Sequence, residues 1–312
     1  MSVMRNEKCP VQWRRSLQAK GLLTNGLLGL TVIGTMVLGL TGCIQEYVDD
    51  QLVLGPRTVE LDTTELSPTL LAERIREIDE NYAEPRTPAR VALSLETSLI
   101  SISPVNDYEA LWRGMRACAW LARNYPLSTD GPLASLGASA SMRRQFALRG
   151  VALGQQARAK ISHRVESFYY LGQCQLALLE QGLNVARPTI REAQEHLKIA
   201  IALDAGFDHC GPRRALGEVL IAASERTFLR KGARDAYVRD ATDHLRAAAN
   251  ACPDYAKNRL ALARASIKRR DYETARANLE EVLVSQTPAD YASDHERWLE
   301  EANELLIDLQ GK

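Results

Sequence analysis

Apolar residues recur at three- and four-residue spacings from Ser67 to near the C-terminus, which is the period of an amphipathic helix. Ser67-Pro68 and Thr87-Pro88 each combine an N-cap residue with a proline suited to the first helical position. The first apolar stripe consists of Leu70, Leu71, Ile75 and Ile78. No stretch after Ser67 alternates with period two between hairpin turns, so the pattern predicts an all-α protein and argues against a β architecture.

The helices recur in pairs, most clearly over 256–289. Leu262-Ala263 places a large and a small residue side by side on the first helix, and Asp271-Tyr272 marks the turn. Ala275, Leu279 and Val282 follow on the second helix, at positions 20, 24 and 27 of a 34-residue unit. This unit resembles the tetratricopeptide repeat (TPR), whose small residues let two helices approach closely.

Three earlier units repeat the pattern with less regularity. They cover 106–157, 162–205 and 210–253, and the last two carry Leu171-Gly172 and Leu216-Gly217 at positions 7 and 8. Extra residues near 182–189 and around 224–235 predict long inter-helix loops. Residues 65–105 are expected to form N-terminal helices, and 290–309 to cap the array. The fold class expected is a TPR-like right-handed superhelix of antiparallel helix hairpins with a C-terminal capping helix; an ordinary helical bundle is the alternative.

The N-terminus has the pattern of an export signal. Five basic residues precede a run without charge that extends from Gly21 to Gln45, and the run contains Leu40-Thr41-Gly42-Cys43. This tetrad resembles the bacterial lipobox, which implies cleavage of residues 1–42, attachment of acyl chains at Cys43 and a tether over 43–64. An uncleaved transmembrane anchor is the alternative. In a Gram-negative cell, Ile44 after the lipidated cysteine favours the outer membrane, with the protein facing the periplasm.

The net charge of the chain is informative only after the signal is removed. The whole chain has 39 Lys and Arg against 39 Asp and Glu, which excludes nucleic-acid binding driven by bulk positive charge. The mature chain would be mildly acidic, because the signal takes away more basic than acidic residues.

Four cysteines remain if Cys9 leaves with the signal and Cys43 is lipidated. Cys210 and Cys252 fall at neighbouring ends of one predicted hairpin, so we expect that a disulfide can join them. Cys118 and Cys174 both fall at position 10 of their first helices, where a bridge between neighbouring helices is harder; buried free thiols are favoured there.

The sequence contains no zinc-protease, phosphate-loop, nucleophile-elbow or Cys-x-x-Cys motif, so neither an enzyme nor a metal or other cofactor is expected. The positions that face the concave side of a TPR array have a basic bias. They hold Arg113, Trp120, Glu166, Tyr169, Gln173, Arg214, Glu218, Lys257, Arg264 and Lys268. We expect them to bind an acidic peptide or a carboxylate-bearing ligand, so that charge reversal at Arg214 and Arg264 abolishes binding. A solvated charged face is the alternative.

Four segments, together with the lipobox, resemble the TPR lipoproteins associated with tripartite ATP-independent periplasmic (TRAP) transporters. They are 108–113 (YEALWR), 211–217 (GPRRALG), 278–283 (NLEEVL) and 300–306 (EEANELL). The resemblance implies a membrane-tethered helical protein that contacts the solute-binding subunit and holds or relays a ligand. An accessory of outer-membrane or pilus assembly is the rival interpretation, and homo-oligomerisation is left open.

Overall fold

The computed structural model describes residues 67–105, 107–125, 138–181, 187–226, 230–286 and 288–312, all of which belong to the compact unit Gln51–Lys312. These residues form α2 (Pro68–Tyr82), α3 (Pro88–Val105), α4 (Tyr108–Asn124), α5 (Ala138–Lys160), α6 (Val165–Glu180), α7 (Arg187–Leu203), α8 (Phe207–Ser224), α9 (Lys231–Ala251), α10 (Ala256–Lys268), α11 (Tyr272–Leu283), the 3-10 helix η2 (Ala289–Tyr291) and α12 (Ala292–Asp308). The expected signal sequence, Cys43 and the tether lie outside the described residues.

Side-chain caps fix where the first helices begin. The Ser67 hydroxyl accepts a hydrogen bond from the Leu70 amide at 3.2 Å, and the Thr87 hydroxyl accepts one from the Arg90 amide at 3.3 Å. The Asp107 carboxylate accepts from the Glu109 amide at 2.8 Å. Each bond satisfies an amide that a helix N-terminus would otherwise leave unpaired. The start signals read from the sequence at Ser67 and Thr87 are therefore confirmed.

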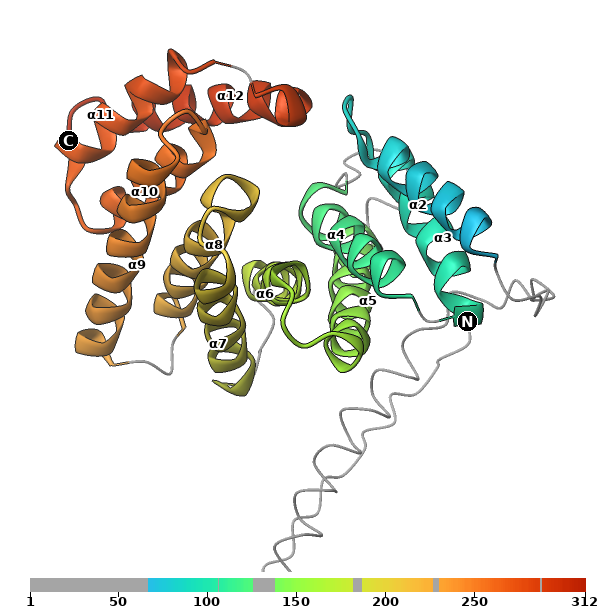
Figure 1. Cartoon of the computed structure of the whole chain (residues 1–312). Helices are drawn as coiled ribbons and strands as arrows, with labels where there is room; N and C mark the ends of the chain where they lie inside the picture. The colour runs from blue at the N-terminus through green and yellow to red at the C-terminus, as the bar shows by residue number, and fades with distance from the viewer. Residues whose placement is uncertain (1–66, 106, 126–137, 182–186, 227–229, 287) are drawn as a thin grey trace, which may run out of the picture. The chain divides into compact units, whose positions relative to one another are not determined.

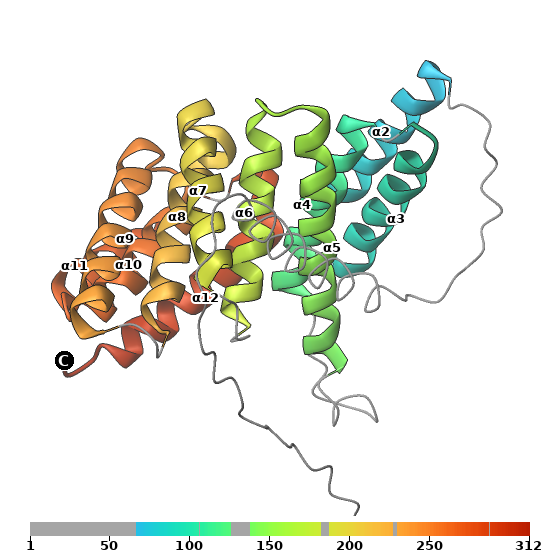
Figure 2. The ribbon, with the colours of Figure 1, turned by 90° about the horizontal axis from the view of Figure 1, so that it is seen from below.

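Neighbouring helices pack as hairpins, in the pairs α2–α3, α4–α5, α6–α7, α8–α9 and α10–α11 (Figures 1 and 2). The first helices of successive hairpins also pack on one another, α4 on α6, α6 on α8 and α8 on α10. The described residues contain no strand. This arrangement confirms the expected all-α fold of stacked helix pairs.

Glycine at position 8 explains how two of the hairpins close. A Cβ atom added to Gly172 would lie 2.6 Å from Leu197 Cγ, and one added to Gly217 would lie 2.5 Å from Leu245 Cγ. Leu197 and Leu245 are the bulky residues at position 24 of the facing helices, and both are fully buried. The absence of a side chain at the glycine is therefore what gives the opposite leucine its place between the two helices.

Replacing Gly217 with valine is expected to lower the free energy of unfolding by about 1–3 kcal/mol, because the new side chain overpacks the α8–α9 contact. The added Cβ would also meet the Ala241 carbonyl oxygen at 3.1 Å. A backbone atom cannot move away by a change of rotamer, as a side chain can. Urea denaturation measures the change. Gly232→Val on α9 is the matched control, since nothing lies within 4 Å of its added Cβ. Equal effects of the two substitutions would contradict this account of the contact.

The extra residues of the unit 210–253 lengthen a helix as well as a loop, which corrects the expectation of a long loop alone. Helix α9 has 21 residues, whereas α11 has only 12. The added turns of α9 lie before Ala241, at Lys231–Asp240, where Gly232 is the poorest helix former and no proline interrupts. An insertion of this composition extends the helix because each added residue adds a backbone hydrogen bond.

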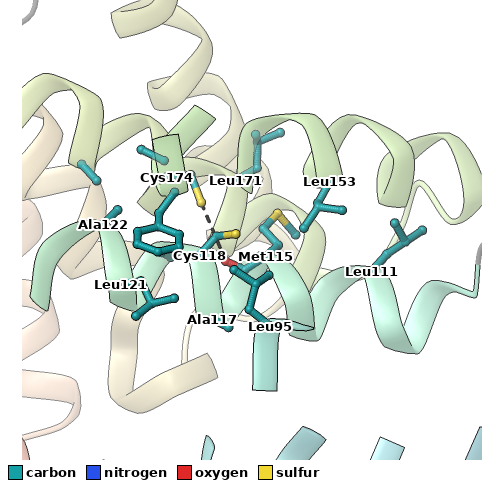
Figure 3. Packing of buried hydrophobic residues seen from close by; sticks show 14 of the residues in the cluster. Leu95, Leu111, Met115, Ala117, Cys118, Leu121, Ala122, Leu153, Leu171 and Cys174 are labelled. Carbon is teal, nitrogen blue, oxygen red and sulfur yellow. Dashed lines mark hydrogen bonds between the residues drawn. The ribbon is translucent and has the colours of Figure 1, made fainter. Parts of the chain in front are cut away.

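Cys118 and Cys174 lie in the hydrophobic core that α4, α5 and α6 share (Figure 3). Both are free and fully buried. A Cβ atom on Gly150 would lie 2.2 Å from the Cys174 sulfur, so this glycine provides the space that the thiol occupies. Burial raises the pKa of Cys118 to about 12, which keeps its thiol protonated and unreactive at neutral pH.

The C-terminal helix does more than cover the last hairpin. Helix α12 packs on α10 and α11, and its first residues also contact residues near the start of the described chain. Arg86 pairs with Asp294 at 3.3 Å, and the Ser293 amide donates to Glu84 at 3.0 Å. We call Glu84, Arg86, Ser293 and Asp294 the N–C clasp. It places the start of α12 beside the turn between α2 and α3.

Candidate functional site

A cavity of about 350 Å³ lies where the first helices face α12. Its described lining comes from helices that are widely separated in the chain. The lining residues are Tyr82, Ala119, Trp120, Arg123, Asn124, Arg143, Tyr169, Tyr170, Gln173, Asp208, Lys257, Leu260, Arg264, Tyr291, Asp294, Arg297, Trp298 and Glu301. A volume of this size is at the lower end of the range for small-molecule sites.

Asp208 organises one wall of the cavity. Its carboxylate accepts hydrogen bonds from the Tyr169 and Tyr291 hydroxyls and from Arg214 at 3.4 Å. Burial and the negative charge of Asp208 raise the pKa of Tyr169 well above its usual value, so the hydroxyl remains a donor. Gln173 in turn donates to the Tyr169 oxygen at 3.3 Å. The wall is therefore a connected polar network.

Asp208 reaches this position through an unusual backbone turn. Asp208, His209 and Cys210 have φ values of 49°, 54° and 63°, in the left-handed region that side chains normally avoid. Such conformations cost of order 1–3 kcal/mol each and persist only where the surroundings hold them. Here the His209 carbonyl accepts a hydrogen bond from Asn258 at 3.1 Å, and its ring stacks on Tyr255 with centroids 4.5 Å apart.

Arg214 lies behind the cavity and stabilises the left-handed turn at 208–210. Its side chain is 1% exposed, and it donates to Asn258 at 2.9 Å, to Tyr169 at 3.3 Å and to Asp208. It also lies over the Tyr255 ring, 5.0 Å from the centroid. A buried cation with this many acceptors holds the surrounding groups in one arrangement. Arg214 is therefore enclosed by its own chain and does not line the cavity.

Basic side chains outnumber acidic ones around the cavity. Arg123, Arg143, Lys257, Arg264 and Arg297 line it, against Asp208, Asp294 and Glu301. Three of the arginines have carboxylate partners. Arg264 pairs with Glu301, Arg297 pairs with Asp294 at 2.8 Å, and Arg123 pairs with Glu180 at 2.7 Å. Lys257 and Arg143 form no ion pair with any of the described residues.

Lys257 is the more enclosed of these two cations. Its ammonium lies 5.8 Å from the Trp298 ring centroid. Burial, followed by the positive charges of Arg123 and Arg214, lowers the pKa of Lys257 to about 7, against the opposing effect of Glu218 and Asp294. The cavity therefore contains a lysine whose positive charge is disfavoured and which is only partly protonated at neutral pH.

Glu218 lies behind Arg123, with its side chain 9% exposed and its carboxylate 3.4 Å from the guanidinium. Burial alone would raise the pKa of Glu218, but the charges of Arg123, Lys257 and Arg214 lower it below its usual range. Glu218 is thus ionised and already engaged with its own chain.

The structure brings together some of the concave residues expected from the sequence and separates others. Trp120, Tyr169, Gln173, Lys257 and Arg264 line the cavity. Arg214 and Glu218 lie behind it. Arg113 instead pairs with Asp79 at 2.9 Å, and Lys268 pairs with Glu225. Glu166 pairs with Arg164 at 2.8 Å. These pairings are within the chain, so the face is not a simple row of solvated charges.

Sequence reasoning missed the residues that α12 and the preceding turn contribute, namely Tyr291, Asp294, Arg297, Trp298 and Glu301. The repeat pattern places this segment at the end of the array and carries no signal that it turns toward α4 and α6. It also missed Arg123 and Arg143, although their basic character adds to the bias that the sequence does show.

The structure contains a disulfide between Cys210 and Cys252, whose Cα atoms lie 6.1 Å apart. It connects the left-handed turn at the start of α8 to the end of α9, two residues from Asp208 in the sequence. The bond thus ties the backbone that positions Asp208 to the second helix of the same hairpin.

Within the described ranges, no cluster of three or more His, Cys, Asp or Glu side chains is suited to a metal ion. None of the described helices is long and apolar enough to cross a membrane.

Comparisons with known proteins place the fold but not the family. No family model matches the sequence, and no curated protein matches it. Among solved structures, the fold is similar to the crystal structure of a thermophilic TPR protein from Thermus thermophilus. The match covers 75% of this chain and 99% of that chain, with a TM-score of 0.50 and 18% sequence identity. At this identity the similarity shows a TPR-like fold and no more.

Proposed function

We propose that this protein is a non-enzymatic, lipid-anchored periplasmic TPR scaffold that binds a protein partner and a small ligand as an accessory of a TRAP-type transporter. The TPR-like fold supports the scaffold role, and the lipobox with the four family-like segments supports the location and the transporter. The solute-binding subunit is then the expected partner.

The observation that carries the scaffold proposal is the convergence of the first helices and α12 on one polar cavity. Its lining contains no His, Cys, Ser or Thr among the described residues, so a Ser–His or Cys–His pair is not found there. The Asp208, Asp294 and Glu301 carboxylates are all engaged with donors of the same chain. This chemistry suits binding better than bond breaking.

Helix α12 also limits how a partner can approach. Arg297 on α12 donates to Asn124 on α4 at 2.6 Å, so the helix occupies part of the side where TPR arrays often hold peptides. The rim of the cavity is the remaining accessible part, and the Arg297 side chain is 52% exposed there. We therefore expect a protein partner to contact α12 and the rim.

A photo-crosslinking amino acid at Arg297, with another at Lys198 as the control, tests the proposal in native membranes. Lys198 is exposed on α7 and does not line the cavity. A solute-binding protein crosslinked from position 297 and not from 198 is the expected result. A barrel protein or a pilin in its place would favour the assembly accessory. Absence of a position-dependent crosslink would overturn both interpretations.

The lipid anchor is tested separately through Cys43. The Cys43→Ala variant is expected to leave the membrane fraction and to lose metabolic labelling with an alkyne fatty acid, because the thioether that anchors the chain cannot form. Cys118→Ala is the control, since this thiol is buried and free in the structure. Retention of the Cys43→Ala protein in membranes, with labelling unchanged, would contradict lipidation at this site.

A further inference from the structure

Apolar packing does not join α12 to the N-terminal helices. The hydrophobic clusters of the described residues combine α3 with α4–α6, α6 with α7–α9, and α10 with α11 and α12, and a smaller one joins α9 to α10. None of these clusters contains both a residue of α12 and a residue of α2, α3 or α4. Polar contacts therefore hold the two ends together, where Figure 1 shows the start of α12 beside the turn between α2 and α3.

We call the N–C clasp, together with the contact of Arg297 with Asn124, the seam. Arg86 crosses the seam in the clasp, where it pairs with Asp294 at 3.3 Å and lies 4.5 Å from the centroid of the Tyr291 ring. Arg297 crosses it at α4 and donates to the Asn124 side chain at 2.6 Å. When two surfaces separate, such hydrogen bonds are exchanged for hydrogen bonds to water, so each one stabilises closure only modestly.

Each side of the seam also has an ion pair of its own. Arg86 pairs with Glu84 at 2.8 Å on one side, and Asp294 pairs with Arg297 at 2.8 Å on the other. Breaking a buried ion pair is costly mainly because it leaves one charge without its counter-charge. Separation of the two sides leaves both of these pairs intact, so the seam can open without that cost.

Like charges face each other next to the seam and oppose its closure. Arg143 on α5 and Arg297 on α12 line the same cavity. Burial, followed by the positive charge of Arg297, lowers the pKa of Arg143, against the opposing effect of Glu180. Closure brings the two guanidinium groups together, and their repulsion favours separation.

The seam forms a wall of two cavities. Asn124, Asp294 and Arg297 line the cavity of about 350 Å³. Glu84 and Arg86 line a neighbouring cavity of about 600 Å³. Opening of the seam would therefore expose both cavities at once.

We propose that the seam is a gate, through which α12 separates from the α2–α4 end of the array while the helix hairpins on both sides remain packed. The motion breaks the N–C clasp and the contact of Arg297 with Asn124, and it opens both cavities. This goes beyond the proposed function, because it concerns the chain alone and needs neither a protein partner nor a ligand.

Double electron–electron resonance on the purified full-length protein in detergent measures the motion. Spin labels attached through a ketone-bearing amino acid leave the cysteines unchanged. One pair, at Glu96 on α3 and Glu304 on α12, spans the seam; the control pair, at Glu280 on α11 and Glu304, lies on one side of it. All three positions are exposed. We expect a shorter and a longer distance for the spanning pair and a single distance for the control pair.

Variants should shift the ratio of the longer to the shorter distance in opposite directions. Arg86→Met should raise it about tenfold, since it removes hydrogen bonds of a charged group across the seam. Asn124→Ala removes the acceptor of Arg297 at a partly exposed position and should raise it about threefold, which keeps the test valid if Arg86→Met fails to fold. Arg143→Gln should lower it roughly twofold, because the like charges no longer face each other. Lys198→Gln, exposed on α7, is the control and should leave it unchanged.

A single distance for the spanning pair that neither Arg86→Met nor Asn124→Ala changes would overturn the proposal. Lengthening of the control pair together with the spanning pair would also overturn it, because loss of helix packing would then explain the change. A higher ratio in Arg143→Gln would contradict the role of repulsion and count against the gate. The measurement uses the chain alone, so a failure of the gate is distinguishable from a failure of the crosslink to a protein partner.

Discussion

Replacing Arg214 with alanine is expected to lower the free energy of unfolding by about 3–5 kcal/mol, the cost of breaking a buried charge network. The substitution leaves Asp208 with one fewer donor in a buried site, and it removes the hydrogen bond to Asn258 at 2.9 Å. It also removes the group that lies over the Tyr255 ring. Urea denaturation followed by circular dichroism measures the loss.

Arg213→Ala is the matched control, since Arg213 is adjacent in the chain, partly exposed and not part of this network. It should change the free energy of unfolding by less than about 0.5 kcal/mol. A loss for Arg214→Ala no larger than that of the control would show that the network is not important for stability. Charge reversal at Arg214 is for the same reason a poor probe of partner binding, because it would destabilise the fold. Arg264, with its side chain 41% exposed, is the better position.

Removing the disulfide through Cys210→Ser and Cys252→Ser together is expected to lower the free energy of unfolding by about 4 kcal/mol. The bond joins residues separated by 42 positions, and the loss of loop entropy in the unfolded chain gives this magnitude. The Tm should fall by roughly 10 °C. Differential scanning calorimetry measures both quantities.

Dithiothreitol provides the control for the disulfide. The reduced wild-type protein should resemble the double variant, and the variant itself should not respond to the reductant. Cys118 and Cys174 are free in both proteins, so they do not contribute to the difference. An equal shift of wild type and variant on reduction would show that another effect of the reductant is responsible.

The repeat pattern predicted the helix pairs because it reports local contacts within a hairpin. Gly172 and Gly217 are recognisable from their neighbours Leu171 and Leu216 and from the spacing to Leu197 and Leu245, which they meet across the hairpin. The helix starts also depend on local contacts, since Ser67, Thr87 and Asp107 cap amides three or fewer residues away. The lengthening of α9 was missed because the pattern counts residues between fixed positions and does not say whether they are helical.

The cavity could be predicted only in part. Lys257, Arg264 and Gln173 follow from the repeat register, which states which positions of each first helix share a face. The contribution of α12 depends on contacts such as Arg297 with Asn124, which are distant in sequence and follow no repeat. The burial of Arg214 could not be predicted, for a different reason. Its register position predicts the concave side, but the left-handed turn at 208–210 brings acceptors around it and buries it.

The N–C clasp has a consequence for how the protein unfolds. In a linear repeat array each unit contacts only its neighbours, so the terminal units fray at low cost and unfolding can proceed one hairpin at a time. The contact of Arg86 with Asp294 spans 208 positions and connects the two ends of the described array. Neither end can then fray without breaking the contact with the other, which favours cooperative unfolding. The same contact of high sequence separation forms late and slows folding, because a long loop must close before it is made.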